Sequence, residues 1–139
     1  MSAIILEVFP LIKRRLLRFD DNAGGGTLSP IHIQILSRLN HEGTQTVSEL
    51  GRELMIAKPN MTPPLRKLAE DGLIARDSDR YDRRIVNVSI TDTGRGYLDE
   101  YCERVSEYIM EKLPLLSGEN LYEFTNALIM VKKVLDKIS

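Results

Sequence analysis

The sequence has a single cysteine, Cys102, among its 139 residues, so the chain cannot form an internal disulfide. A scarcity of cysteine fits a protein from a reducing compartment. No apolar run approaches the roughly 18 residues of a membrane span. The N-terminus places apolar residues ahead of the basic cluster at 13–15, which is the reverse of a secretory signal. These absences predict a soluble cytoplasmic protein without a membrane partner.

Patterns typical of enzymes and metal sites are also lacking. There is no nucleophile beside a base and no carboxylate pair in a plausible cleft, and the glycines at 24–26 lack the lysine and spacing of a phosphate-binding loop. His32 and His41 are isolated, without the spacing of metal ligands. Neighbouring glutamates disfavour a thiolate at Cys102, although the sequence does not decide whether that thiol senses oxidants. We therefore expect no enzyme, no cofactor and no metal.

The net charge of −1 shows no excess of either sign, but the charges are unevenly distributed. Residues 1–57 carry six basic and six acidic side chains, residues 58–86 carry seven and five, and residues 87–139 carry six and nine. The middle of the chain is therefore basic and its last third is acidic. Because contact with DNA depends on the local field, near-neutrality does not exclude a DNA-binding protein.

Apolar periodicity and capping residues predict mostly helices. Residues 4–19 carry one apolar stripe that includes Leu16 and Phe19, followed by a glycine-rich loop at 20–26. Ser29-Pro30 begins a second helix, which ends near Gly43. Its predicted buried face consists of Ile33, Leu36 and Leu39. The capping box from Thr46 to Glu49 begins a short third helix that runs to about Leu54.

A fourth helix follows within residues 58–72, with Met61, Leu65 and Leu68 facing inward. Pro63 and Pro64 cannot donate helical hydrogen bonds. We therefore expect either a kink or a regular helix that begins at Thr62 as N-cap, with residues 58–61 as an irregular or 3₁₀ entry.

Two strands, 73–76 and 85–90, then flank the charged stretch Asp77 to Arg84. Thr91 caps a long helix that runs to Leu113 and is closed by Pro114, and Ser117 caps the last helix. The last helix has apolar residues at alternating spacings of three and four, which is a heptad seam. They are Leu121, Phe124, Leu128, Val131, Leu135 and Ile138.

A short helix, a turn, a second helix and a two-stranded hairpin together make a winged helix-turn-helix. The sequence also carries two specific patterns. One is the run Lys58-Pro59-Asn60-Met61-Thr62-Pro63 with Leu65, Lys67-Leu68 and Gly72-Leu73-Ile74; the other is Arg76, Asp82-Arg83-Arg84, Ile90-Thr91 and Gly94. These patterns resemble those of the MarR (multiple antibiotic resistance regulator) family, and the resemblance extends over essentially the whole chain.

The resemblance implies a mainly α, α+β fold: a winged helix-turn-helix DNA-binding domain with N- and C-terminal helices that form a dimerisation domain. The expected boundaries are 1–28 for the first dimerisation helix and loop, 29–91 for the DNA-binding domain and 92–139 for the C-terminal dimerisation helices. The expected function is a DNA-binding transcription regulator, with a repressor favoured. It would bind a pseudo-palindromic operator as a homodimer and be released by a small-molecule effector, for which no residue identifies a binding site.

The expected DNA contacts lie on the fourth helix and on the hairpin. Residues near a helix N-terminus read base edges in the major groove, which selects Lys58, Asn60, Thr62, Arg66 and Lys67. By resemblance, Arg84 reaches the minor groove, Arg80 and Arg83 contact phosphates, and Asp82 pairs with one of the arginines and orients it. Taken alone, Asn60 and Thr62 are equally compatible with a capping role, and a charged hairpin tip is commonly just solvated.

The expected dimer interface combines the stripe of the first helix with the seam of the last, because these helices exceed what a winged helix needs. Its residues are Ile5, Phe9, Ile12, Leu121, Phe124, Leu128, Val131 and Leu135. The same seam is also compatible with an ordinary intrachain core. A second function stays open: a winged-helix protein-interaction module, similar to an antirepressor, that does not itself bind DNA.

Overall fold

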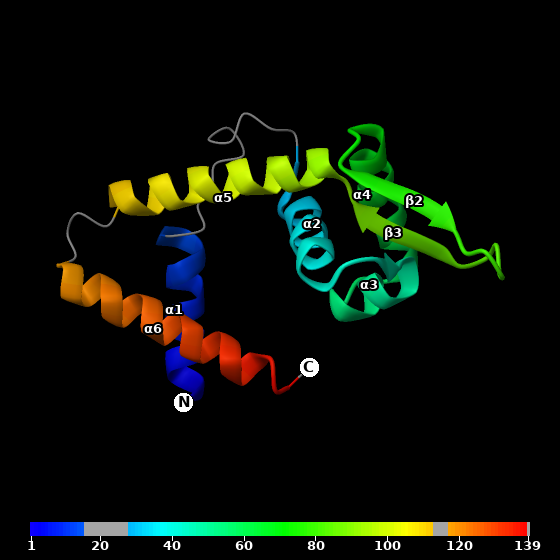
Figure 1. Ribbon diagram of the computed structural model, residues 1–139. Coiled ribbons are helices and arrows are strands. Elements are labelled where there is room, and N and C mark those ends of the chain that lie inside the picture. The colour runs from blue at the N-terminus through cyan, green and yellow to red at the C-terminus, as the bar shows by residue number, and fades with distance from the viewer. Residues whose placement is uncertain (16–27, 113–116, 139) are drawn as a thin grey trace. The chain divides into compact units, whose positions relative to one another are not determined.

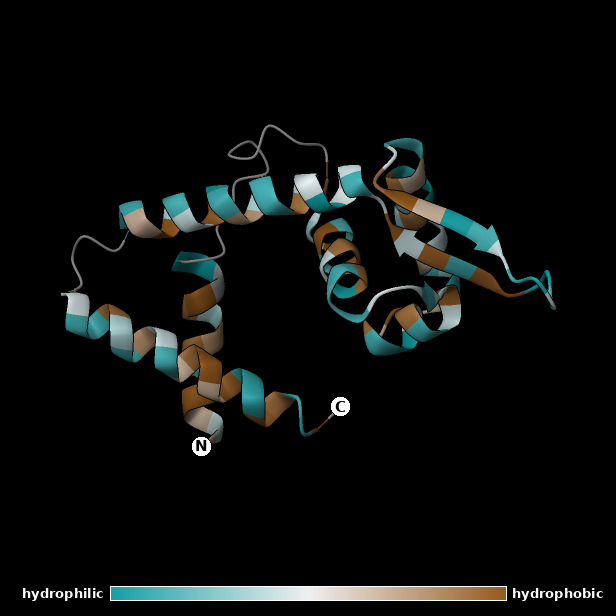
Figure 2. Cartoon of the chain, in the orientation of Figure 1, coloured by the Kyte–Doolittle hydropathy of each residue, from teal (hydrophilic) through white to brown (hydrophobic). Residues whose placement is uncertain are grey.

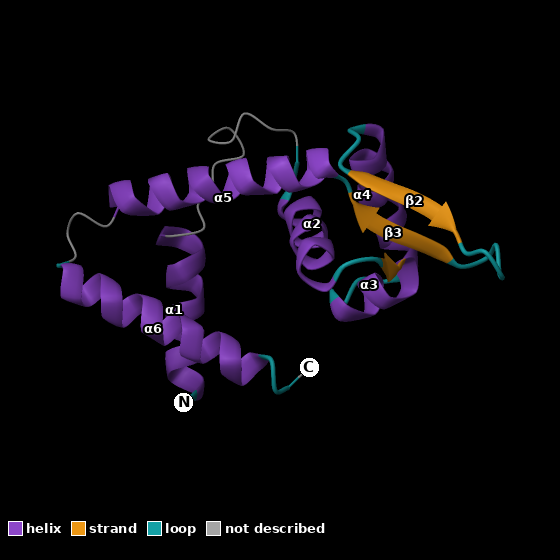
Figure 3. Ribbon diagram, in the orientation of Figure 1, coloured by secondary structure: helices purple, strands orange, loops and turns teal. Residues whose placement is uncertain are grey.

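The computed structural model describes residues 1–15, 28–112 and 117–138 (Figure 1). The chain divides into two compact units, Met1–Glu103 and Arg104–Ser139. Helices predominate among the described elements, and the strands lie together (Figure 3). In chain order the elements are α1 (Ser2–Arg15), α2 (Pro30–Glu42), β1 (Gln45–Thr46), α3 (Val47–Glu53), α4 (Lys58–Glu70), β2 (Ile74–Ser78), β3 (Val86–Ile90), α5 (Asp92–Lys112) and α6 (Gly118–Leu135).

Some predicted features fall outside the described residues. They are Leu16 and Phe19 of the first stripe, the glycine-rich loop at 20–26, and Leu113 with Pro114. Within the described part, α1 begins at Ser2, two residues earlier than predicted.

The start of α2 is the predicted one, with Ser29 as N-cap and Pro30 at the first helical position. The Ser29 N–H donates a hydrogen bond to Nδ1 of His32 at 2.9 Å, which satisfies a backbone group at the helix start. The predicted buried face is only partly correct, because Ile35 is fully buried whereas Ile33 is half-buried. The buried stripe of α2 is therefore rotated from the one read from the sequence.

The third helix has its predicted capping box. The Glu49 N–H donates to Oγ1 of Thr46 at 3.1 Å, and the Thr46 N–H donates to Oε2 of Glu49 at 3.0 Å. The residues just before it form β1, a strand that the sequence analysis missed. Gln45 pairs with Val88 in β3, so the pairing that makes this strand is distant in sequence and leaves no local signal.

The helix α4 begins at Lys58, with Ala57 as N-cap. Of the two expected arrangements, the one with a helix start at Thr62 is therefore wrong, because residues 58–60 are already α-helical. Pro59 explains the earlier start, because a proline in the first helical turn has a suitable φ and lacks an N–H that would have no intrahelical partner there. Pro63 and Pro64 are accommodated inside the helix.

The end of α4 is a Schellman motif around Gly72. The Gly72 N–H donates to the Ala69 carbonyl at 3.0 Å, and the Leu73 N–H donates to the Leu68 carbonyl at 2.9 Å. Gly72 has a φ of +72°, a left-handed conformation that glycine adopts without steric cost. This turn leads the chain directly into β2.

The described strands form an antiparallel sheet in the order β1-β3-β2. The pairing of β2 with β3 runs from Ile74 opposite Ile90 to Ser78 opposite Val86. This register turns the side chain of Val88 into the core, where it is fully buried. Beyond Ser78 and Val86 the two strands are joined by the loop that carries the arginines.

The core of the first unit is formed by α2, α3, α4, the strands and the beginning of α5, with apolar colour on their facing sides (Figure 2). Burying such side chains is the main stabilising contribution to a fold of this size. The buried apolar residues are Ile35, Leu36, Leu39, Leu50, Met61, Leu65, Leu68, Leu73, Ile74, Val88, Ile90 and Leu98.

The junction between β3 and α5 explains the Thr-x-x-Gly pattern. Oγ1 of Thr91 accepts the Gly94 N–H at 3.0 Å and donates to the Gly72 carbonyl at 2.7 Å. A Cβ added at Gly94 would lie 2.1 Å from the Leu73 carbonyl oxygen, far inside van der Waals contact. Thr91 therefore fixes the start of α5, and only glycine allows that helix to approach the α4–β2 turn this closely.

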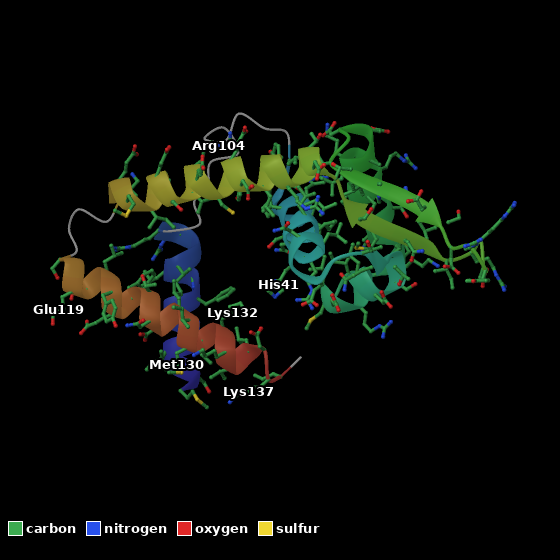
Figure 4. The ribbon with its side chains drawn as sticks, in the orientation of Figure 1. His41, Arg104, Glu119, Met130, Lys132 and Lys137 are labelled. Carbon is green, nitrogen blue, oxygen red and sulfur yellow. The ribbon has the colours of Figure 1, made fainter. Side chains whose placement is uncertain are left out.

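The second unit contains the end of α5 and the helix α6. Oγ of Ser117 accepts the Asn120 N–H at 3.2 Å, so Ser117 is the predicted N-cap of α6. Lys132, labelled in Figure 4, donates to Oδ2 of Asp136 at 2.8 Å. None of the residues of α6 is buried in the described structure, so this helix contributes no residue to a closed core.

Candidate nucleic-acid interface

The helix α4 has a buried side and an exposed side. Met61, Pro64, Leu65 and Leu68 are buried, as helical spacing requires. The opposite face carries residues with the spacing i, i+3, i+4 and i+7, and all of them are exposed: Pro59, Thr62, Pro63 and Arg66. The structure thus presents Thr62 and Arg66 outward together with two prolines that the sequence analysis did not select.

The remaining predicted residues of α4 lie beside this face. Lys58 and Asn60 are exposed in the first turn of the helix. Lys67, near the other end, is half-buried, and its Nζ lies 3.0 Å from Oδ2 of Asp71. Because this ion pair neutralises part of its charge, Lys67 should attract a phosphate more weakly than Lys58 does.

The turn that leads from α3 into α4 contains an unexpected strained residue. Met55 has a φ of +55° and is 93 % exposed. Its N–H donates to the Arg52 carbonyl at 3.2 Å, and the Ile56 N–H donates to the Gly51 carbonyl at 2.8 Å, which makes a second Schellman motif. The sequence predicted a turn between these helices but not the left-handed conformation of Met55, because glycine rather than methionine favours it.

The position of α3 is fixed by a polar cluster that the sequence analysis also missed. Oε2 of Glu53 accepts hydrogen bonds from Nε of Arg38 at 2.7 Å and from Nε2 of Gln45 at 2.8 Å. Both hydrogen bonds lower the pKa of Glu53 below its ordinary value, and the bond from Arg38 has the larger effect. The cluster joins α2, β1 and α3, so it stabilises the arrangement of the helix-turn-helix.

The loop between β2 and β3 is held by its own backbone. The Asp79 N–H donates to the Ile85 carbonyl at 2.8 Å, and the Ile85 N–H donates to the Asp82 carbonyl at 3.0 Å. The carboxylate of Asp79 accepts the N–H groups of Tyr81 and Asp82, each at 3.3 Å. These bonds stabilise the tip of the hairpin without help from the core.

Nitrogen-bearing side chains extend outward from this loop (Figure 4). Arg80 and Arg83 are exposed. Oδ1 of Asp82 accepts both the backbone N–H of Arg84 at 3.0 Å and its Nε at 3.2 Å. The Arg84 side chain nevertheless stays 92 % exposed. The structure thus contains the expected pairing of Asp82 with a wing arginine, and it leaves the guanidinium accessible.

His32 has a structural position at the start of α2. Burial and the neighbouring charge of Lys67 lower its pKa, while the hydrogen bond with Ser29 and the charge of Asp71 act in the opposite direction. Among the residues that the structure describes, no three His, Cys, Asp or Glu side chains are grouped to hold a metal ion. Cys102 is exposed on α5.

The apolar residues expected at a dimer interface are only partly covered within the chain. On α1, Ile5 and Phe9 are exposed and Ile12 is half-buried. On α6, Leu121 and Phe124 are half-buried, whereas three further members of the seam are exposed: Leu128, Val131 and Leu135. Residues that expose this much apolar surface on a helix commonly mark an interaction site. The structure also describes no helix that is both long and apolar enough to cross a membrane.

Comparison with known proteins supports one family. The profile of the MarR family matches residues 28–86. The HTH-type transcriptional regulator MhqR of Bacillus subtilis is 29 % identical over 138 residues, covering 96 % of this chain and 93 % of that protein. The organic hydroperoxide resistance transcriptional regulator of Bacillus subtilis is 31 % identical over 106 residues, covering 76 % of this chain and 70 % of that protein.

Among solved structures, a MarR family protein from Bacillus stearothermophilus superposes with a TM-score of 0.79 at 20 % identity, covering 97 % of this chain and 95 % of that one. This likeness confirms the predicted fold class, a mostly helical winged helix-turn-helix. The motifs at 58–74 and 76–94, the hairpin, the profile match and the relatives agree: this chain belongs to the MarR family of helix-turn-helix transcription regulators.

Proposed function

We propose that the protein acts as a homodimeric repressor, with α4 in the major groove of a pseudo-palindromic operator and the β2–β3 loop in the adjacent minor groove. The observation that carries this proposal is the hairpin tip, where Asp82 holds an arginine that is still 92 % exposed. A narrow minor groove has an enhanced negative potential that attracts such a side chain. An ordinary solvated tip needs no carboxylate to orient its arginine.

The contacts divide by chemistry. Asn60, Thr62 and Arg66 contact base edges, while Lys58 supplies charge to phosphates. Lys67 makes a weaker contact, because Asp71 competes for its ammonium group. Arg84 enters the minor groove, and two exposed loop arginines contact the flanking phosphates: Arg80 and Arg83.

Dimer formation is supported by the exposed apolar residues of α1 and α6. In this proposal, residues 1–28 and 92–139 form the dimerisation part and residues 29–91 the DNA-binding part. A two-fold dimer places its half-sites about 34–36 Å apart, which is one turn of DNA. The complex forms in the cytoplasm and represses by covering the promoter, and we assign it no catalytic step.

Regulation by a small molecule is part of the proposal, although no residue identifies the ligand. An effector that binds the dimer better in one spacing of the two winged helices necessarily changes the affinity for the operator.

The test measures the affinity of the full-length protein for a duplex from upstream of its own gene and for a random duplex. Arg84→Glu should weaken specific binding by about 1–3 kcal/mol. Arg95→Glu is the matched control, because Arg95 is an exposed arginine paired with Asp92 on α5 and is not among the proposed contacts. Fluorescence anisotropy at low salt measures all three proteins.

Two outcomes would contradict the proposal. One is equal affinity of the unchanged protein for the upstream and random duplexes. The other is specific binding that Arg84→Glu leaves intact, or that Arg95→Glu weakens just as strongly. If the protein instead binds no DNA but captures another regulator, the winged-helix interaction module becomes the better assignment.

A further inference from the structure

The exposed face of α4 is unusually apolar for a surface that meets nucleic acid. Its four residues, Pro59, Thr62, Pro63 and Arg66, contribute two pyrrolidine rings, one threonine methyl group and one guanidinium. Only Thr62 and Arg66 carry a side-chain hydrogen-bond donor. The two proline rings of this face cannot hydrogen-bond to a base edge.

Pro63 is the residue that suggests what this face recognises, because its exposed ring makes no contribution to the core that would explain a proline there. Its ring is exposed, whereas its neighbour Pro64 is buried and packs in the core side of the helix. A proline inside a helix lacks the N–H that would bond to the residue four positions earlier, so it destabilises the helix. Such a cost at an exposed position is typical of a residue kept for recognition.

The two prolines leave backbone acceptors in this region without their usual helical donors. Because Pro63 and Pro64 have no N–H, the carbonyls of Pro59 and Asn60 lack their usual intrahelical partners. At positions 63 and 64 the backbone therefore has no N–H that could hydrogen-bond to a base edge. What remains available at the centre of the face, around Thr62 and Pro63, is apolar surface.

We propose that α4 reads thymine methyl groups, with the Thr62 γ-methyl and the Pro63 ring each packing against a thymine of the half-site. This inference rests on the proposed placement of α4 in the major groove. There the thymine C5-methyl is the distinctive apolar group on the base edges, and threonine methyls are known to contact it. Lys58 and Arg66, exposed at the two ends of the same segment, supply the charge that holds the helix to the duplex.

The test begins with duplexes enriched from a random-sequence library by the full-length protein. Each half-site thymine is then replaced by uracil, which removes the methyl group and changes no hydrogen-bonding group. For each contacted thymine, binding should weaken about fourfold, as expected for one buried methyl group. Replacing thymines outside the half-sites should have no effect.

Variants assign the effect to individual side chains. Thr62→Ser keeps the hydroxyl and removes the methyl, so the difference between thymine and uracil should vanish at one position. Pro63→Ala should remove the difference at another position, and because it restores a helical N–H, loss of folding cannot explain the result. Arg84→Ala is the control: it should weaken binding to both duplexes equally, because the methyl lies in the other groove.

Each outcome decides a different point. An enriched duplex that binds equally well with thymine or uracil at every half-site position overturns this inference and leaves the proposed function standing. A thymine preference that survives both Thr62→Ser and Pro63→Ala overturns the assignment to α4. If no duplex is enriched over the starting library, the proposed function and this inference fail together.

Discussion

The winged helix and the helix α6 contain similar apolar residues but place them very differently. The leucines and isoleucines of α2, α3, α4 and the strands are buried within their own unit, whereas those along α6 are half-buried or exposed. Figure 2 shows apolar residues along α6 as well as within the winged helix. The difference teaches that the winged helix buries its apolar residues within one chain, whereas the described residues leave the apolar seam of α6 uncovered, as the proposed dimer would require.

The largest expected effect tests this difference with two leucines. Leu68→Ala in the core should lower the free energy of unfolding by about 3 kcal/mol, because it leaves a cavity in packed surroundings. Leu128→Ala on α6 should act mainly by weakening the dimer, so its effect should depend on protein concentration. Urea unfolding at two protein concentrations measures both. Equal, concentration-independent losses for the two variants would remove the distinction.

A smaller effect is expected where α5 leaves the winged helix. Gly94→Ala should destabilise the protein by about 2 kcal/mol, because its Cβ would overlap the Leu73 carbonyl. Gly96→Ala, one half-turn further, is the control: a Cβ there meets nothing within 4 Å, so helix propensity should make it neutral or stabilising. Thermal unfolding followed by circular dichroism distinguishes them, and similar stability of the two variants would show that the close approach does not exist.

The two Schellman turns of the winged helix give a prediction of about 1 kcal/mol. Met55→Gly should stabilise the fold, because it relieves a left-handed methionine at the end of α3. Gly72→Ala, at the equivalent position after α4, should destabilise it by a similar amount. Chemical denaturation measures the change in the free energy of unfolding for each variant. A loss of stability in Met55→Gly would mean that the exposed methionine contributes contacts that the isolated chain does not show.

The smallest effect concerns how the stability of the winged helix depends on pH. The pKa of Glu53 is lowered in the folded state from an ordinary value of 4.5. Its stabilising contribution is therefore present above that value and is lost as the pH falls through the lower, folded-state pKa. Glu53→Gln should flatten the stability profile in this acidic range, as measured by urea unfolding at a series of pH values. An unchanged acidic limb in the variant would exclude Glu53 as its source.

Local sequence signals predicted the elements well wherever a capping side chain or a glycine marks a boundary. Thr46, Thr91 and Ser117 all accept the predicted backbone N–H groups. The errors share another cause. The strand β1 depends on pairing between Gln45 and Val88, and the choice of Ile35 over Ile33 depends on what α2 packs against. Neither is visible in a local window, because distant residues decide both.

The candidate site likewise has features that the sequence predicted and features that only the structure revealed. Its arginines and the residues at 58–67 could be chosen from their motifs, but their roles on DNA stay predictions. The strained Met55 and the Glu53 cluster came only from the structure.

By itself, the sequence determined the order of helices, the hairpin and the family pattern, because capping, apolar periodicity and turn residues act over a few positions. Tertiary structure decided that β1 pairs with β3, that Ile35 rather than Ile33 is buried, and which carboxylate holds Arg38. These features depend on packing and hydrogen bonds between parts of the chain that only folding brings together.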